Sequence, residues 1–489
     1  MIASAAMVES PRGADADQSP AHTGALAGFA LAMTAWTERW IPDAFVFALL
    51  ATVVVVAAAL LGTPTALLDI ASIWGTGFWE LVPFTMQMAL VIITGYVLAS
   101  SPAMGRLIAR LAAVPRTPRA AVAWVTLFAL VSSWFNWGFS LAFSAVLARQ
   151  VARRVPGVDY RAVAAASVLG LGSIWAQGLS GSAALQMASP GALPPRIRDI
   201  VAADGLVPDG IIGLSHTIFL WQSLVSVLVE IVVVVAVMWF ATPPASRART
   251  ARDMGINLDD GEAGANVPRE ALTPGNWLEH SRLLSLFIVG LGGLYLYRYF
   301  AVAPQPLNAL TLNIVNLIFL LTGVLLHGTP ARLLHAVRVA TPSVWGVILQ
   351  YPFYAGIAAI ITGTHLSAQL AGAFVSVSTR TTYPIVVAIY SAVLGVFVPS
   401  GGSKWVVEAP YVMAAAHTLQ VHLGWVVASY DLGEALANLV QPFWMLPVLG
   451  VLGLKARDIM GYTFVVFVVL TPVVLLLVGL LGATLRYPL

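Results

Sequence analysis

Two polar interruptions lie inside long apolar stretches at matching places in the two halves of this 489-residue chain. The first is residues 132–138, with the sequence SSWFNWG, and the second is residues 399–405, with the sequence PSGGSKW. Each is followed about 40 residues later by another break, at residues 178–182 (GLSGS) and 438–442 (NLVQP). Glycine, proline and clustered hydroxyl or amide groups at membrane depth leave backbone groups free, which is tolerable only beside a protein-lined, wetted cavity. The paired breaks therefore predict a substrate site.

The composition indicates a membrane protein. Of all residues, 59% are hydrophobic and 10% are charged, whereas roughly 25% are charged in an average soluble domain. Because the chain has no cysteine, disulfides, thiolate nucleophiles and cysteine-based metal sites are excluded, and we expect no cofactor or metal. The net charge of +3 rests on basic residues placed mostly in a few loops. That placement reports membrane topology rather than nucleic-acid binding.

The distribution of charge predicts an all-α polytopic fold with re-entrant hairpins. The loop between the first two apolar runs, 44–61 and 81–99, has no lysine or arginine, and the loop after the second carries four arginines. The first loop is therefore expected outside and the second inside. Residues 120–148 are apolar but flanked by basic clusters at both ends. This pattern predicts a hairpin entering from the cytoplasm, with arms of about a dozen residues that are too short to cross roughly 30 Å of hydrocarbon.

The second half repeats the first at an offset of about 260 residues. An extra span between the halves would invert the second repeat, giving about nine spans plus two opposed re-entrant hairpins, with broken helices in both repeats. The expected regions are a disordered tail (1–25), an N-terminal membrane repeat (26–241) that opens with an interfacial helix (26–41), a cytoplasmic polar linker (242–282) and an inverted C-terminal membrane repeat (283–489).

The breaks are suited to binding an anion. Helix arms that begin at hairpin tips present unpaired N–H groups and the positive end of a helix dipole. Hydroxyls cap such starts, glycines allow close approach, and amides add further polar groups. The predicted substrate-binding residues are Gln87, Asn136, Ser180, Gly181, Ser182, Gln350, Ser400, Gly401, Gly402, Ser403 and Lys404. The alternative is that these small residues merely allow close helix packing.

Ionisable residues within apolar stretches are usually functional. Lys404 is expected either to act as a counter-ion for the substrate or to form an intrahelical pair with Glu408, one turn further along. Glu434, one turn before Asn438, is the candidate carrier of a coupling proton or sodium ion, together with Asn438 and Gln441. Its alternative is a buried carboxyl group that is hydrogen-bonded to neighbouring spans. Glu230 lies among valines and is expected to bridge helices.

Several further segments carry a family resemblance. They are Ile41–Asp43, Gly77–Trp79 with Met86–Leu90, Asn136–Phe139, Ala152–Gly157, Phe353–Ile357, Val398–Gly402, Gln441–Trp444 and Arg457–Tyr462. Together they resemble the bacterial short-chain fatty acid transporter family, over nearly the whole chain from about residue 35.

This resemblance implies uptake of butyrate, acetoacetate and related short monocarboxylates across the bacterial cytoplasmic (inner) membrane. The wider superfamily implies inverted repeats with re-entrant hairpins, a proton or sodium ion as the coupling partner, and assembly as a homodimer in the lipid bilayer. The family often has histidine and glutamine where this chain has Lys404 and Glu408. A dicarboxylate or another small anion therefore stays open as the substrate.

One sequence pattern is also compatible with an enzyme, an intramembrane serine protease. Gly178–Gly181 matches the GxSG pattern of intramembrane serine proteases, in which Ser180 would be the nucleophile. Four small residues recur by chance in a chain with 41 glycines, and no histidine is expected at mid-membrane depth to act as a base. Neither a zinc-binding HExxH motif nor a Walker A phosphate loop occurs. The sequence thus favours a secondary-active carrier over an enzyme.

Overall fold

The computed structural model describes residues 44–203, 205–244, 246–258, 273–398, 400–441 and 443–489, and these residues form helices and loops without a strand. The predicted tail (1–25) and interfacial helix (26–41) lie outside the described residues, as do residues 259–272 of the predicted linker. The first-half α-helices are α2 (Ala44–Gly62), α3 (Leu67–Gly77), α4 (Val82–Ala99), α5 (Pro102–Leu111), α6 (Pro118–Phe135), α7 (Trp137–Arg154), α8 (Tyr160–Val168), α9 (Ser182–Met187), α10 (Pro195–Val201) and α11 (Trp221–Ala241). The later α-helices are α12 (Pro274–Glu279), α13 (Arg282–Ala301), α14 (Leu312–His327), α15 (Pro330–Ala340), α16 (Trp345–Gly363), α17 (Leu366–Val377), α18 (Tyr383–Phe397), α19 (Gly401–Thr418), α20 (Leu423–Ala437), α21 (Leu446–Leu452) and α22 (Ala456–Gly482).

Length and composition allow six of the described helices, α4, α6, α11, α13, α16 and α22, to cross a membrane. The outermost of them is α13, in which only Ser285 is buried although most of the helix between Arg282 and Arg298 is apolar. A helix with apolar residues all round and no protein cover is expected to face lipid. The predicted all-α polytopic membrane fold is therefore confirmed, whereas the predicted number of about nine spans stays a prediction.

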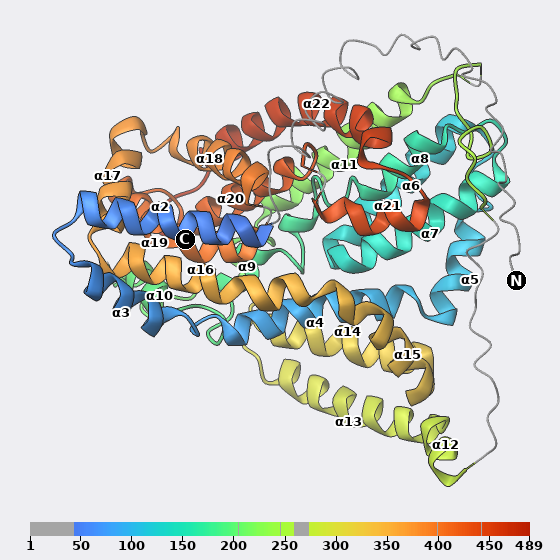
Figure 1. The fold of residues 1–489 in the computed structure, drawn as a ribbon, viewed down its shortest axis with the longest axis horizontal. Helices are drawn as coiled ribbons and strands as arrows, with labels where there is room; N and C mark the ends of the chain where they lie inside the picture. Colours follow the sequence, from blue (N-terminus) through green and yellow to red (C-terminus); the bar gives the residue numbers. More distant parts are fainter. Residues whose placement is uncertain (1–43, 204, 245, 259–272, 399, 442) are drawn as a thin grey trace, which may run out of the picture.

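The same order of elements recurs in the two halves. A long helix (α4 or α16) is followed by a helical hairpin (α6 and α7, or α18 and α19) and then by an interrupted helix beginning with α8 or α20. Figure 1 shows α18 and α19 on the left and α6 and α7 on the right, with α16 and α4 running below them. The recurrence agrees with a repeat, while the inverted relation of the halves stays a prediction.

The first hairpin turns at Asn136, whose side-chain Oδ1 accepts a hydrogen bond from the backbone N–H of Phe139 at 2.8 Å and caps α7. On either side of this turn, the Ser132 hydroxyl donates to the Ser140 hydroxyl at 3.0 Å, and the Ser140 hydroxyl donates to the carbonyl of Ala129 at 2.8 Å. Residues at mirrored distances from Asn136 thus touch, so α6 and α7 run antiparallel.

The predicted arm length of this hairpin was wrong. Each arm has 18 residues and is about 27 Å long. The apolar run underestimates the length of the arms. The reason is that α6 begins at Pro118, with Thr117 as its N-cap, and α7 continues through the basic residues to Arg154. The arms nearly match a hydrocarbon core of roughly 30 Å, so re-entrance no longer follows from length and stays a prediction.

The second hairpin is held together by tyrosines. The Tyr383 hydroxyl donates to the carbonyl of Val412 at 2.7 Å, and the hydroxyls of Tyr390 and Tyr411 share a hydrogen bond of 2.8 Å. Its second arm, α19, begins at Gly401. That helix start lies in the interior of the molecule, because Gly401, Gly402 and Ser403 are all buried.

Candidate functional site

The breaks of the two halves lie against one another. In the first half, the backbone N–H of Trp137 at the hairpin tip donates to the Ser180 hydroxyl at 2.9 Å. Between the halves, the side-chain amide of Asn438 donates to the carbonyl of Leu171 at 3.2 Å. The second hairpin tip is just as close, since a Cβ atom built on Gly402 would lie 3.1 Å from Cβ of Ser182.

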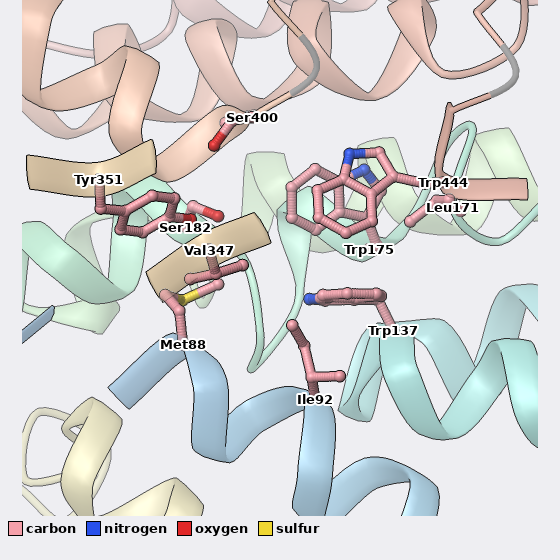
Figure 2. A pocket seen from close by; sticks show the side chains of 11 residues that line it. Met88, Ile92, Trp137, Leu171, Trp175, Ser182, Val347, Tyr351, Ser400 and Trp444 are labelled. Atoms are coloured by element: carbon pink, nitrogen blue, oxygen red, sulfur yellow. The ribbon is translucent and has the colours of Figure 1, made fainter. Parts of the chain in front are cut away.

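A small cavity lies where these breaks meet (Figure 2). It is lined by Met88, Ile92, Trp137, Leu171, Trp175, Ser182, Val347, Tyr351, Ser400, Gly401 and Trp444. These residues come from both hairpin tips, both interrupted segments, α4 and α16. The space open to the centre of a water-sized molecule is about 20 Å³, which is room for roughly one water molecule.

The cavity has an aromatic end and a polar end. The ring of Trp137 lies 6.4 Å from that of Trp175 and 5.3 Å from that of Trp444, between ring centres. Figure 2 shows these indoles together on one side, and the hydroxyls of Ser182 and Ser400 on the other side near Tyr351. A small molecule with one polar end and a short apolar tail matches this arrangement.

The start of α19 forms part of the polar end. Ser400 occupies the N-cap position, but its hydroxyl caps no backbone N–H group of α19 and instead accepts a hydrogen bond from the Ser403 hydroxyl at 2.5 Å. The first N–H groups of this 18-residue helix therefore lack a side-chain cap. Uncapped N–H groups and the helix dipole together favour a bound anion.

Close packing explains a glycine at this helix start. A Cβ atom on Gly402 would lie 2.6 Å from the ring of Phe84, and that ring is stacked on Tyr351 with a centroid distance of 5.6 Å. Any larger residue would push α19 away from α4 and from the cavity. The glycine therefore holds the helix start against the aromatic wall.

The first-half break uses its polar groups within the protein. Ser180 accepts the hydrogen bond from Trp137, and the backbone N–H of Ala184 donates to the carboxylate of Asp431 at 3.1 Å. Gly181 is packed so closely that a Cβ atom there would lie 2.2 Å from the carbonyl oxygen of Ala176. Of the predicted residues in this break, Ser182 lines the cavity, whereas Ser180 and Gly181 do not.

Lys404 has a different partner from the one proposed within its own helix. Its ammonium lies 2.5 Å from the Glu434 carboxylate and donates to the carbonyl of Ser391 at 2.7 Å. The structure therefore pairs Lys404 with Glu434 and not with Glu408. The reason is tertiary: α20 packs beside α19 and brings Glu434 to the ammonium, which local spacing along one helix cannot reveal.

The remaining predicted residues lie near the cavity without lining it. The Gln87 side chain donates to Asn313 at 2.8 Å and joins α4 to α14, and the Asn136 amide donates to the carbonyl of Val91 at 3.3 Å. Gln350 is buried in α16 beside the lining residues Val347 and Tyr351. In the second break, the Gln441 amide donates to Asn438 at 2.8 Å.

Sequence reasoning missed the aromatic half of the site. Trp137 lies within the first break and Trp444 lies two residues after the last one, so an indole at or near a break was the available signal. Trp175 and Tyr351 gave no such signal, because only packing brings them to the cavity.

The helical architecture and the apolar helices define a multi-pass membrane fold, and two solved transporters share this fold. The YdaH transporter of Alcanivorax borkumensis matches with a TM-score of 0.55 and 16% identity, over 90% of this chain and 98% of its own. MtrF of Neisseria gonorrhoeae, described as representing a class of antimetabolite efflux pumps, matches with a TM-score of 0.54 and 14% identity. The match covers 91% of this chain and 97% of MtrF. At these identities the likeness shows the fold alone.

The chain belongs to the short-chain fatty acid transporter family, whose model matches residues 25–481. A protein of Escherichia coli (strain K12) named "Putative short-chain fatty acid transporter" is 38% identical over 430 residues, which are 88% of this chain and 94% of the relative. A protein of Haemophilus influenzae (strain ATCC 51907 / DSM 11121 / KW20 / Rd) with the same name is 34% identical over 441 residues, or 90% and 96%. The predicted family is thus confirmed, and the alternative of a serine protease acting through Ser180 is wrong.

Proposed function

We propose that this transporter carries short monocarboxylates, such as butyrate and acetoacetate, across the bacterial cytoplasmic membrane, coupled to an inward flow of protons or sodium ions. Membership of the family supports the class of substrate. The main structural support is that one cavity contains both the uncapped start of α19 and three indole rings.

The substrate carboxylate is placed at the N-terminal end of α19, beside Ser400 and Gly401. There, N–H groups and the helix dipole offset its charge, while the nearby Lys404 ammonium is already paired with Glu434. The alkyl chain then points toward Trp137, Trp175 and Trp444, where burial of apolar surface stabilises it by about 0.8 kcal/mol per CH₂ group. Because the cavity holds only about one water molecule in this structure, the lining side chains must move apart to admit a four-carbon acid.

The lining argues against a dicarboxylate. None of the described residues that line the cavity is charged, and the nearby Lys404 ammonium is already paired with Glu434. A second carboxylate would lie at the aromatic end, where an unpaired buried charge is strongly unfavourable.

The second break supports the proposed coupling of transport to a cation. Glu434 lies within the same buried region as the helix start, and a Cβ atom on Gly401 would lie 3.1 Å from its Cγ. Asn438 and Gln441 follow along the chain, and Asn438 also reaches Leu171 in the first-half break. An ion bound by these three residues would therefore lie in contact with both halves of the chain.

The test is uptake of labelled butyrate into liposomes containing the purified protein, under a proton gradient or a sodium gradient imposed separately. Protein-free liposomes are the essential control, because protonated butyric acid crosses a bilayer unaided. We expect saturable uptake above that control, inhibited by acetoacetate and not by succinate. The proposal fails if uptake equals that of protein-free liposomes, and its monocarboxylate preference fails if succinate competes as well as acetoacetate.

We further propose that the transporter assembles as a homodimer, as the family resemblance implies. Light scattering of the detergent-solubilised protein measures this directly. A protein mass of about twice the 51.7 kDa of one chain is expected, and the mass of a single chain would contradict it.

A further inference from the structure

Buried carboxyl groups outnumber the cation between α19 and α20. Glu408, Asp431 and Glu434 are exposed by only 2%, 1% and 1%, and the single ammonium among them, that of Lys404, is exposed by 3%. An ionised carboxylate without a partner is strongly unfavourable in such a place, so it is neutralised instead. The question is which of the three carries the proton.

Two of the three carboxyl groups have partners that offset a negative charge. Glu434 is paired with Lys404 at 2.5 Å. Asp431 accepts a hydrogen bond from the backbone N–H of Ala184 at 3.1 Å, at the first turn of α9. Glu408 differs, because among the described residues it has neither an ion pair nor a backbone N–H donor, and the group that hydrogen-bonds to it is the neutral hydroxyl of Tyr430. The groups that face it are Lys404 and Tyr411 of α19, Tyr390 of α18, and Tyr430 and Glu434 of α20.

We propose that Glu408 is the proton-carrying site of this transporter, and that Lys404 moves from Glu434 to Glu408 when that proton leaves. Glu408 lies one helical turn after Lys404, the spacing at which side chains on one helix meet. The ammonium can therefore exchange partners by a change of side-chain rotamer. This inference rests on the proposed function, names its coupling ion as a proton, and assigns that proton to Glu408 instead of to Glu434, Asn438 and Gln441.

The exchange of partners would change the electrostatic potential at the substrate site. Glu434 is wedged between the arms of the second hairpin, since a Cβ atom on Gly401 would lie 3.1 Å from its Cγ and one on Gly395 would lie 2.9 Å from its Oε2. With Glu408 protonated, Lys404 neutralises Glu434 directly behind the start of α19. With Glu408 ionised, Lys404 is drawn away, and the charge on Glu434 repels a substrate carboxylate at that helix start. Proton and carboxylate therefore bind together, as symport requires.

The test is calorimetric titration of the purified protein with butyrate from about pH 6 to pH 9, a range in which the carboxylate of butyrate stays ionised. The matched control is Glu230→Gln. Glu230 is equally buried, at 1% exposure, but its Oε1 atom accepts hydrogen bonds from Gln177 at 2.7 Å and from Ser226 at 3.4 Å. Replacing sodium in the buffer by N-methylglucamine separates the two coupling ions.

Once the pH exceeds the value at which Glu408 ionises, linkage to one proton raises the Kd for butyrate about tenfold per pH unit. The wild-type protein and Glu230→Gln should both show this slope and take up protons on binding, as measured in two buffers of different ionisation enthalpy. Glu408→Gln should bind butyrate independently of pH, without proton uptake. Removing sodium should leave all three Kd values unchanged.

Retention of the wild-type slope by Glu408→Gln would overturn the inference. If that variant does not fold, the wild-type protein alone decides, because butyrate binding without proton uptake, or binding that depends on sodium, is equally incompatible with a proton site. Those outcomes leave the proposed substrate intact. A wild-type protein that binds no butyrate at any pH would instead overturn the proposed function, and this inference with it.

Discussion

Replacing Lys404 by methionine should expose the energetic role of the buried ion pair. The change leaves Glu434, which is 1% exposed, without its counter-ion, and it removes the donor to the Ser391 carbonyl. Removing one partner of a buried pair lowers the free energy of unfolding by about 3–5 kcal/mol. Proton uptake by Glu434 limits this loss. Because an ordinary glutamate has a pKa of about 4.3, holding that proton at pH 7 costs roughly 4 kcal/mol.

We therefore expect Lys404→Met to be about 3–4 kcal/mol less stable than the wild-type protein at pH 7. The folded variant holds a proton on Glu434 that the unfolded chain does not, so acidification favours the folded form. The deficit relative to the wild-type protein should shrink by about 1.4 kcal/mol for each pH unit between about pH 7 and pH 5. Unfolding in mixed micelles of rising SDS content, followed by the helical circular dichroism signal, measures both quantities.

Two double variants identify the partner. Adding Glu434→Gln to Lys404→Met removes the orphaned carboxylate and should restore most of the lost stability. Adding Glu408→Gln should not. The reasoning is refuted if Lys404→Met is as stable as the wild-type protein, or if Glu408→Gln is the change that restores it.

Two further substitutions test the cavity, and a third tests the tip of the first hairpin. Gly402→Ala places a Cβ atom 2.6 Å from the ring of Phe84 and should weaken butyrate binding at least tenfold in titrations, whereas Gly290→Ala, which meets no atom within 4 Å, should bind normally. Trp137→Leu enlarges the aromatic end, so competition assays should show a shift in preference from butyrate toward hexanoate, and an unchanged order of chain lengths would contradict this. Ser180→Ala leaves the buried N–H of Trp137 without its acceptor and should lower the free energy of unfolding by about 1–3 kcal/mol. Unfolding in mixed micelles measures this loss, and unchanged stability would contradict the assigned hydrogen bond.

Local patterns in the sequence were enough to predict the membrane fold, the family and the positions of the breaks. Each break combines residues that disfavour a continuous helix with apolar flanks, and both signals are local. The hairpin turn at Asn136 and the helix start at Gly401 fall within those segments. The roles assigned to the predicted site residues stay predictions.

The rest depended on packing between helices. Lys404 has a carboxylate one turn away on its own helix, yet it pairs with Glu434 of α20, because the approach of two helices is not encoded in the spacing along either one. Trp175 and Tyr351 look like ordinary core residues in the sequence, and only the packing of the two halves of the chain brings them to one cavity. The arms of the first hairpin were underestimated because capped and charged ends extend helices beyond their apolar runs.

The most direct test of the central claim is an anomalous diffraction map of crystals soaked in 4-bromobutyrate, in which the bromine atom marks the end of the alkyl chain. The account predicts one strong peak among the indoles of Trp137, Trp175 and Trp444, with the carboxylate at the start of α19 beside Gly401. A bromine peak at the polar end, or one outside this cavity, would contradict it.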